Sequence, residues 1–397
     1  MRIRYLLLDA YGVGGTIRAT FSMAGALARR GHDVEVASLR QPRPEPRLPL
    51  PPGVRLVSLT GTRPRRVRGL RPGATVRWAT RAALRGTATR LADGADPRVG
   101  SLTLASDLWL RRYVRAQHDC VVVSTREALS VALARVRTEE HVAVAQEHNH
   151  IRRGAPSRAD YVRWYPSLDA LVTLTEGDAA DYRALLGAGC RVETVPNAVP
   201  LGWVAGPARL EDPVVLAAGQ LVHRKGFDLL IDAWGRVARD HPGWRLRIVG
   251  SGRERTDLDR RVGQAGLSGS VELVGFAPDV GAELLGCSVF ALSSRSEGLP
   301  MVVLEAMATG VPVVAFDCPT GPRDLVVHGV TGLLVPPGDV AGLATAIGRL
   351  AADPGLRSAM GAAARDRAAA FDAEVVAARW ERLFGELADD RGLSVGR

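Results

Sequence analysis

Short apolar runs that alternate with glycine turns and amphipathic stretches constrain the fold of this 397-residue chain more than any other feature. The first such unit joins the apolar runs Arg4–Asp9 and Val34–Ser38 through a glycine-rich turn and the amphipathic stretch Ala19–Arg30. The same order restarts at Val214–Ala218. Strands that alternate with helices form parallel sheets with helices on both faces. We therefore predict an α/β protein with two doubly wound, Rossmann-like domains that face a cleft.

The boundary between these domains is expected near residue 200, where proline and glycine accumulate. The first domain would then comprise residues 1–200 and the second residues 201–372, followed by a last helix in residues 373–397. A chain of this length is long for one hydrophobic core and suits two.

The composition indicates the cellular compartment and the relation of the protein to the membrane. The four cysteines are scattered without a C-x-x-C pair, which argues against a disulfide framework or a zinc site and favours a reducing cytoplasm. The apolar run Tyr5–Leu8 is too short for a signal peptide, and no run reaches the roughly 20 apolar residues that span a bilayer. We expect a cytoplasmic protein, at most peripheral at the inner face of the membrane.

The net charge of +10 comes almost entirely from arginine, because Lys225 is the only lysine. Arginines concentrate between Arg63 and Arg115, opposed only by three aspartates. This stretch could form a patch that binds anionic lipid headgroups or an acidic acceptor. The alternative is a solvated helical face. No aromatic interleaving, helix-turn-helix or zinc spacing accompanies it, so we do not expect a nucleic-acid partner.

Residues 292–316 combine a strand end, a loop, a short helix and the next strand. Pro300 suits the first turn of the helix and Gly310 its C-terminal cap. Glu305 lies in the apolar helix and Glu297 in the loop, roughly 10 Å apart at the helical rise. Since a helix N-terminus attracts phosphate, this suggests a ligand with two polyol ends and a charged middle. Alternatively, Glu297 is a solvated loop charge and Glu305 pairs with an arginine.

Glu297-Gly298-Leu299-Pro300 followed by Glu305 resembles the E-x7-E motif of the retaining GT-B glycosyltransferases of family 4. In that family the first glutamate holds hydroxyls of the donor sugar and the second holds the ribose. The resemblance implies the GT-B fold, in which the last helix crosses back to the first domain.

Three further segments are similar to that family. Gly14-Gly15 match a Gly-Gly turn that lets the backbone approach the donor diphosphate; a turn that needs positive φ is the alternative. Gly219 matches a glycine after the first strand of the second domain, and Arg224-Lys225 match a basic pair that holds the diphosphate. The alternative for this pair is solvated surface. The implied donor site comprises Gly14, Gly15, Gly219, Arg224, Lys225, Glu297, Gly298, Leu299, Pro300, Met301 and Glu305.

A polar cluster, Gln146–His150, follows the strand-like Val142–Ala145. Open α/β sheets bind ligands at the carboxyl ends of their strands. His148 is our candidate for a contact with the donor phosphate or the acceptor, with His150 in reserve. A plain surface loop and a metal-ligand pair are the alternatives, but no set of carboxylate and histidine partners follows in the sequence.

Other motifs are rejected on their context. Gly12 and Gly14 begin a dinucleotide fingerprint, but Ile17 holds its third glycine position and no acidic residue ends the second strand, which argues against NAD. Asp257-Leu258-Asp259 resembles a D-x-D metal motif within a charged helix, and we interpret it as a solvated face. The loop Cys318–Asp324 departs from the commoner family loop G-G-x-P-E, so the donor sugar does not carry over from the best-known members.

The resemblance implies a retaining hexosyltransferase that uses a nucleotide-sugar donor, with a UDP-sugar expected, and a hydroxyl of a glycan, lipid-linked or secondary-metabolite acceptor. The acceptor would attack from the leaving-group face, assisted by a donor phosphate oxygen. Glu297, Arg224, Lys225 and His148 would be its catalytic residues, without a metal or other cofactor. A sugar-nucleotide 2-epimerase of GT-B shape and a non-catalytic binding protein are the alternatives.

Overall fold

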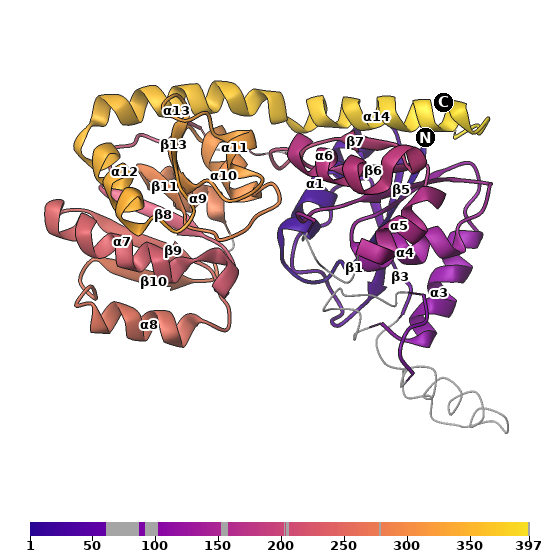
Figure 1. The fold of residues 1–397 in the computed structure, drawn as a ribbon, viewed down its shortest axis with the longest axis horizontal. Helices are drawn as coiled ribbons and strands as arrows, with labels where there is room; N and C mark the ends of the chain where they lie inside the picture. The colour runs from indigo at the N-terminus through magenta and orange to yellow at the C-terminus, as the bar shows by residue number, and fades with distance from the viewer. Residues whose placement is uncertain are drawn as a thin grey trace. The chain divides into compact units, whose positions relative to one another are not determined.

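A computed structural model of the chain describes residues 1–60, 87–91, 102–151, 158–201, 203, 206–277 and 279–395. The chain divides into two compact units. Unit 1 comprises Met1–Pro196 with Ala373–Arg397, and unit 2 comprises Asn197–Asp372. Each is an α/β unit built around its own parallel sheet (Figure 1). The division falls shortly before the boundary expected at residue 200. Much of the arginine-rich stretch between Arg63 and Arg115 lies outside the described residues.

The sheet of unit 1 has seven strands in the order β3-β2-β1-β4-β5-β6-β7, all paired in parallel. Their continuous apolar runs are buried because helices cover both faces. The strands are β1 (Arg2–Asp9), β2 (Asp33–Arg40), β3 (Val54–Ser58), β4 (Val121–Ser124), β5 (Val142–Gln146), β6 (Ala170–Thr173) and β7 (Val192–Thr194).

The helices of unit 1 form a layer on each face of this sheet. Helix α4 packs against α3 and α5 in one layer, and α1 packs against α14 in another. The α-helices of this unit are α1 (Gly15–Arg29), α3 (Leu104–Arg115), α4 (Glu127–Val136), α5 (Arg158–Trp164), α6 (Glu176–Leu186) and α14 (Ala373–Asp390).

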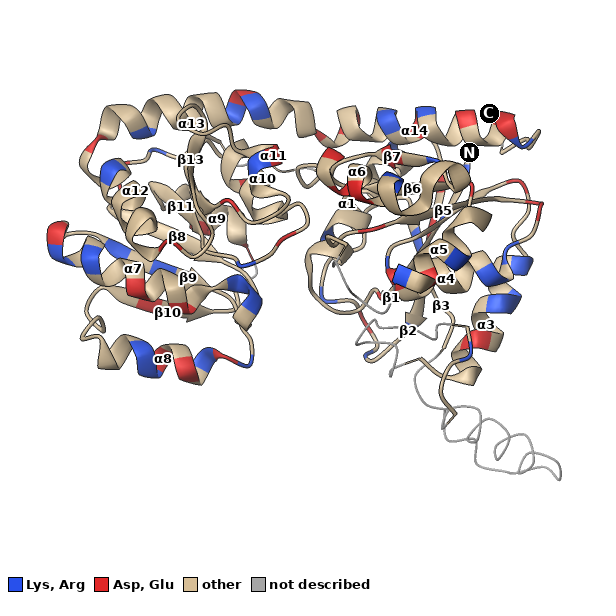
Figure 2. Ribbon diagram, viewed as in Figure 1, with Lys and Arg blue, Asp and Glu red and all other residues tan. Residues whose placement is uncertain are grey.

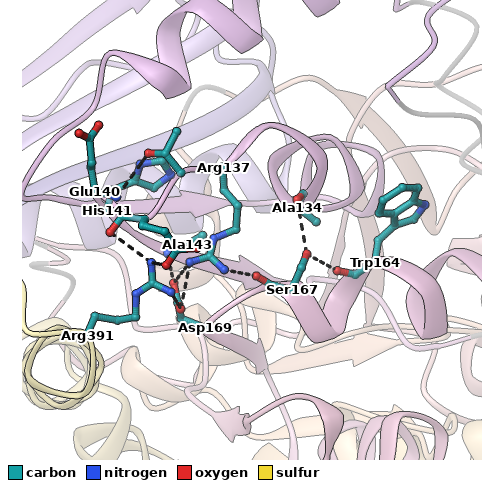
Figure 3. Close-up of polar contacts among 11 residues, drawn as sticks. Ala134, Arg137, Glu140, His141, Ala143, Trp164, Ser167, Asp169 and Arg391 are labelled. Carbon is teal, nitrogen blue, oxygen red and sulfur yellow. Dashed lines mark hydrogen bonds and ion pairs between the residues drawn. The ribbon is translucent and has the colours of Figure 1, made fainter.

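The last helix, α14, is fixed to unit 1 by its buried face and by ion pairs. Trp380 and Phe384 are buried side by side, with ring centroids 5.1 Å apart. On the rim, Arg30 of the α1 C-terminus pairs with Glu381 at 2.6 Å. Beyond the helix, Arg391 approaches Asp169 at 3.3 Å, a carboxylate that also accepts from the N–H at the start of β5 (Figure 3). These contacts explain why the chain end belongs to unit 1.

The sheet of unit 2 has six parallel strands in the order β10-β9-β8-β11-β12-β13. Its core includes the fully buried Trp234 of α7. The strands are β8 (Val214–Ala218), β9 (Arg245–Val249), β10 (Val271–Gly275), β11 (Val289–Leu292), β12 (Val313–Phe316) and β13 (Gly332–Val335). The α-helices are α7 (Phe227–Asp240), α8 (Arg255–Gln264), α9 (Val280–Leu285), α10 (Met301–Ala308), α11 (Pro322–Leu325), α12 (Val340–Ala352) and α13 (Pro354–Ala368).

The predicted fold class is confirmed, since both units are doubly wound and their sheets are parallel throughout the described strands. One helix start differs from expectation, and one helix is preceded by a 3₁₀ turn. Helix α1 begins at Gly15, at the end of the glycine turn itself, rather than at Ala19. The segment after β8 forms a 3₁₀ turn at His223–Lys225 before α7 begins, because Gly226 adopts a left-handed conformation (φ 65°) between them.

None of the helices in the described ranges combines the length and the apolar composition that crossing a bilayer would require.

Candidate active site

The charged residues predicted to bind a donor meet at one point of the unit 2 sheet. From β8 the chain moves outward through β9 to β10, and then returns to add β11 on the other side of β8. The strand order therefore reverses between β8 and β11, which is where open parallel sheets bind their ligands. Arg224 and Lys225 follow β8, and Glu297 follows β11.

Glu297 is held by three side chains in a buried position. Its Oε1 lies 2.5 Å from Lys225 Nζ and accepts a 2.5 Å hydrogen bond from the Ser294 hydroxyl. Its Oε2 lies 3.3 Å from Arg224 Nη1. The Glu297 side chain is 5% exposed and that of Arg224 41%, so the carboxylate is enclosed while the guanidinium reaches solvent. The interpretation of Glu297 as a solvated loop charge is therefore wrong.

Burial alone would raise the pKa of Glu297, but the charges of Lys225 and Arg224 and the hydrogen bonds from Lys225 and Ser294 together outweigh it. The net result is a pKa below the usual value for glutamate. Glu297 is therefore ionised at neutral pH and acts as an acceptor of hydrogen bonds.

The two loops that carry these charges are locked to each other. Arg295 donates from its side chain to the carbonyl of His223 and pairs with both carboxylate oxygens of Asp228, at 2.8 and 2.6 Å. A Cβ on Gly226 would lie 2.0 Å from the carbonyl oxygen of Ser293, so only glycine permits this approach. The position of Lys225 relative to Glu297 is thus fixed by backbone contacts.

Gly219 belongs to the same cluster. Its N–H donates to the Val249 carbonyl at 2.9 Å, and a Cβ there would lie 3.5 Å from Lys225 Cε. The glycine therefore borders the stem of the lysine, as the donor site implied by the resemblance requires.

The surrounding protein contacts three successive carbonyls of the loop 297–299, two of them through hydrogen bonds. Thr320 donates from its hydroxyl to the Glu297 carbonyl at 3.0 Å, and Asn197 donates from its side-chain amide to the Leu299 carbonyl at 3.1 Å. Between them, a Cβ on Gly321 (φ 92°) would lie 1.9 Å from the Gly298 carbonyl oxygen. Sequence reasoning missed Thr320 and Asn197. The one signal was the unusual loop Cys318–Asp324, which supplies Thr320 and Gly321.

Because the carbonyls turn inward, the loop presents N–H groups instead. The N–H groups of Gly298, Leu299 and Met301 donate to no acceptor within the described ranges. Pro300, expected in the first helical turn, is the N-cap of the eight-residue helix α10 and supplies no side-chain cap. These free donors at a positive helix end suit an anion such as phosphate.

Glu305 lies within α10 and its side chain is fully buried. Its predicted contact with a ribose stays a prediction.

In unit 1, the other predicted residues lie at the carboxyl ends of β1 and β5. Gly14 and Gly15 form an exposed turn at the start of α1, and a Cβ on either would meet no atom within 4 Å. The turn therefore has open space beside it.

His148 follows β5 and is half-buried, with its Nε2 enclosed and without a hydrogen-bond partner in the part of the chain that the structure describes. Burial and the nearby charge of Arg126 lower the pKa of His148 to about 4. A neutral imidazole at pH 7 suits a hydroxyl better than a phosphate. His150, the reserve candidate, is engaged instead by Asp178 at 2.6 Å, which in turn accepts from Thr175.

Two other features bear on the predictions. Asp257 and Asp259 are exposed and pair with Arg260 and Arg255 of the same helix, which agrees with a solvated face. Among the described residues, no three His, Cys, Asp or Glu side chains gather closely enough to hold a metal ion.

Sequence reasoning also passed over the buried Glu147, which accepts hydrogen bonds from Tyr165 at 2.6 Å and Ser130 at 2.9 Å. Burial raises the pKa of Glu147 to about 7. The composition of the loop gave no signal for this, because the shift depends on the helices packed around it.

A solved structure with the same architecture defines the class. A mutant of S. aureus TarM, crystallised with fondaparinux, α-GlcNAc-glycerol and UDP, superposes with a TM-score of 0.77 over 96% of this chain and 99% of that one, at 14% identity. The fold is therefore that of the GT-B glycosyltransferases.

Sequence comparison finds a glycosyltransferase family model in each half of the chain. The family model described as glycosyltransferase family 4 matches residues 13–203, and the model described as glycosyl transferases group 1 matches residues 205–367. Together the two models match most of the chain and, with the fold, support a glycosyltransferase of the GT-B type.

Two curated relatives of this chain carry names with different activities. An exopolysaccharide phosphotransferase of Streptomyces coelicolor is 35% identical over 98% of this chain and 41% of its own length. A GDP-mannose-dependent phosphatidylinositol monomannoside mannosyltransferase of Mycolicibacterium smegmatis is 40% identical over 38% of this chain and 42% of its own length. The chain thus spans less than half the length of either relative.

The ionised state of Glu297 predicts a specific pH dependence of stability. We expect Glu297→Gln to destabilise unit 2 by about 3 kcal/mol at pH 7, because Lys225 loses its partner in a buried pair. Since the pKa of Glu297 is lower in the folded state than in the unfolded state, this contribution is complete above the unfolded value of about 4.3 and disappears as the pH falls through the folded value. Denaturant unfolding at pH 7, 5 and 3.5 measures the difference.

The matched control is Glu272→Gln, which removes an exposed carboxylate paired with Arg247 in the same unit. It should cost less than about 1 kcal/mol at every pH. An equal effect of the two substitutions, or a gap between wild type and Glu297→Gln that widens below pH 4, would contradict the assigned charge state.

Proposed function

We propose that this chain is a retaining hexosyltransferase that moves a sugar from a UDP-sugar to a hydroxyl of a glycan, lipid-linked or secondary-metabolite acceptor. The observation that carries the proposal is the meeting of Arg224, Lys225 and Glu297 beside the free N–H groups before α10. Two cations, one carboxylate and a helix N-terminus offer complementary contacts to a diphosphate and to the sugar attached to it.

The diphosphate would bind to the cationic side of this cluster. Arg224 reaches solvent and Lys225 is close to its carboxylate partner, so both can face phosphate oxygens while remaining oriented by Glu297. The N–H groups near Leu299 and Met301 add donors that need no reorganisation. As the bond to the sugar breaks, negative charge grows on the leaving diphosphate, and these fixed donors stabilise it.

Glu297 would orient the sugar by accepting from its hydroxyls. A carboxylate has about four acceptor sites, and the side chains of Lys225, Ser294 and Arg224 use three of them. Glu297 therefore has room for one sugar hydroxyl without releasing a protein partner. This limits its role to orientation, since a carboxylate held by two cations is a weak nucleophile.

The remaining predicted residues complete the proposal. Glu305 would take the ribose hydroxyls, the Gly14-Gly15 turn would approach the diphosphate, and neutral His148 would contact the acceptor or a sugar hydroxyl. The acceptor hydroxyl would attack from the leaving-group face and pass its proton to a donor phosphate oxygen, so the anomeric configuration is retained. We propose that no metal is needed, because side chains and N–H groups supply the positive field.

The comparisons support a nucleotide-sugar donor more firmly than any one base. The TarM crystal contains UDP, whereas the Mycolicibacterium relative depends on GDP-mannose. The Streptomyces relative is called a phosphotransferase, but this chain corresponds to 41% of it, and residues 13–203 and 205–367 match glycosyltransferase models. We therefore favour sugar transfer over transfer of a sugar phosphate. A cytoplasmic location at an anionic membrane surface is a further part of the proposal.

Two alternatives make different predictions. A sugar-nucleotide 2-epimerase would convert one nucleotide-sugar into another without an acceptor. A non-catalytic binding protein would bind the donor without turnover. Product analysis by mass spectrometry, with and without candidate acceptors, separates these outcomes from sugar transfer and from sugar-phosphate transfer.

Donor binding can be tested before the acceptor is known. A thermal-shift screen against UDP-, GDP-, ADP- and dTDP-sugars should show stabilisation by UDP-sugars, with about 2.7 kcal/mol at a hundredfold excess over Kd. Lys225→Ala and Glu305→Ala should abolish the shift, and EDTA should leave it unchanged. Arg239→Ala, an exposed cation on α7, is the control and should respond as wild type does. Equal shifts in wild type, Lys225→Ala and Glu305→Ala would contradict the site.

Because Thr320 supports the loop that carries Glu297, we predict that replacing Thr320 weakens binding of the donor sugar more than binding of the nucleotide. Thr320→Val keeps the shape of the side chain but leaves the Glu297 carbonyl without its donor, at a cost of about 1–3 kcal/mol. Since Glu297 contacts the sugar and not the nucleotide, calorimetry should show the affinity for a UDP-sugar falling about tenfold more than the affinity for UDP. Thr320→Ser keeps the hydroxyl and should restore the wild-type ratio. A parallel loss of both affinities in Thr320→Val would mean that Thr320 only stabilises the fold.

A further inference from the structure

Helix α3 of unit 1 presents a face of arginines and large apolar side chains to solvent. Leu108 is 51% exposed and Trp109 44% exposed, and Arg111, Arg112 and Arg115 are exposed as well. Leu108 and the three arginines follow the i, i+3, i+4, i+7 spacing of one helical face, and Trp109 borders it. The opposite side of the helix packs into the core of unit 1. We call these five residues the α3 face.

Carboxylates of the described residues do not balance the charge of the α3 face. Within the described ranges, no carboxylate lies at ion-pair distance from Arg111, Arg112 or Arg115. Figure 2 shows the blue bands that basic residues form along the ribbon of α3. The acidic residue of the helix, Asp107, is buried and accepts from the Thr89 hydroxyl and the Arg90 N–H. On the exposed helix α8 of unit 2, by contrast, arginines alternate with aspartates and pair with them. The α3 face is therefore suited to an anionic partner.

Basic side chains alone would suit any polyanion, so the apolar pair decides between partners. Exposed Leu108 gains nothing from a soluble polyanion, whereas it gains free energy on entering a hydrocarbon phase. Tryptophan favours the boundary between headgroups and acyl chains, and arginine can bury its stem there while its guanidinium binds lipid phosphates. An amphipathic helix with this combination lies in the plane of a membrane surface.

We propose that the α3 face docks on an anionic bilayer, with Leu108 and Trp109 entering the interface and the three arginines binding lipid phosphates. The docking does not depend on the proposed sugar transfer. It does have a consequence for it: α3 precedes the parallel strand β4, so the helix starts near the carboxyl edge of the sheet, where Gly14-Gly15 and His148 lie. A bilayer along α3 would then bring a lipid-linked acceptor beside that edge.

The test is co-sedimentation of the full chain with vesicles. Wild type should bind vesicles of phosphatidylcholine with 30% phosphatidylglycerol and should bind pure phosphatidylcholine vesicles far more weakly. The triple variant Arg111→Gln, Arg112→Gln, Arg115→Gln should lower the partition coefficient about 100-fold, given about 1 kcal/mol for each basic residue near an anionic surface. The double variant Leu108→Ser, Trp109→Ser should lower it at least about tenfold while keeping the charge.

The matched control is Arg236→Gln, Arg239→Gln, Arg365→Gln, which removes three exposed arginines from unit 2 and changes the net charge equally. It should bind as wild type does within about twofold. Circular dichroism confirms that each variant is folded. The two α3 variants test separate contributions to binding, because one removes positive charge and the other removes apolar side chains. Donor binding, read by thermal shift, should be unchanged in all three.

Three results would overturn the proposal. The first is no binding of wild type to the anionic vesicles. The second is an equal loss in the unit 2 control, which would indicate net charge and not the α3 face. The third is wild-type binding by the Leu108→Ser, Trp109→Ser variant together with tight binding of dextran sulfate at the three arginines, which would make the face a site for a soluble polyanion.

Discussion

The buried ion pair between Lys225 and Glu297 is the interaction on which the site of unit 2 depends. Burying either charge alone would be unfavourable, so each requires the other, and the loops after β8 and β11 must stay in register to keep them 2.5 Å apart. The Arg295–Asp228 pair and the close approach of Gly226 to Ser293 maintain that register. The strand order reverses between β8 and β11, and the ion pair therefore lies at the point of the sheet where a donor would bind.

The supports around Glu297 explain how a short loop can present donors to an anion. Thr320, Gly321 and Asn197 hold the carbonyl side of the loop, which leaves its N–H side free. Orientation of the peptide groups is therefore built into the protein before any ligand arrives, which is the condition under which fixed dipoles are most effective. The protein likewise sets the charge of His148 before any ligand arrives. Its pKa of about 4 keeps the imidazole neutral at pH 7, so it is not a third cation.

Sequence alone predicted most of the architecture but only part of the site. Strands such as β5 and β8 were located within a residue because a buried parallel strand is a continuous apolar run between turns. The placement of Lys225 and Glu297, 72 residues apart, in one site followed from a family resemblance and not from periodicity, and their ion pair was not predicted. Thr320, Asn197 and the raised pKa of Glu147 were missed, because each depends on groups that only the folded chain brings together. The start of α1 was placed too late, because the helix already begins at Gly15 of the glycine turn.

The most direct measurement of the central claim is the position of a bound diphosphate in a crystal structure of the complex with a non-hydrolysable UDP-sugar. The account predicts a phosphate oxygen within hydrogen-bond distance of Lys225 Nζ and of a backbone N–H between Gly298 and Met301, with one sugar hydroxyl on Glu297. A diphosphate bound elsewhere, with the Lys225–Glu297 cluster contacting only solvent, would contradict it.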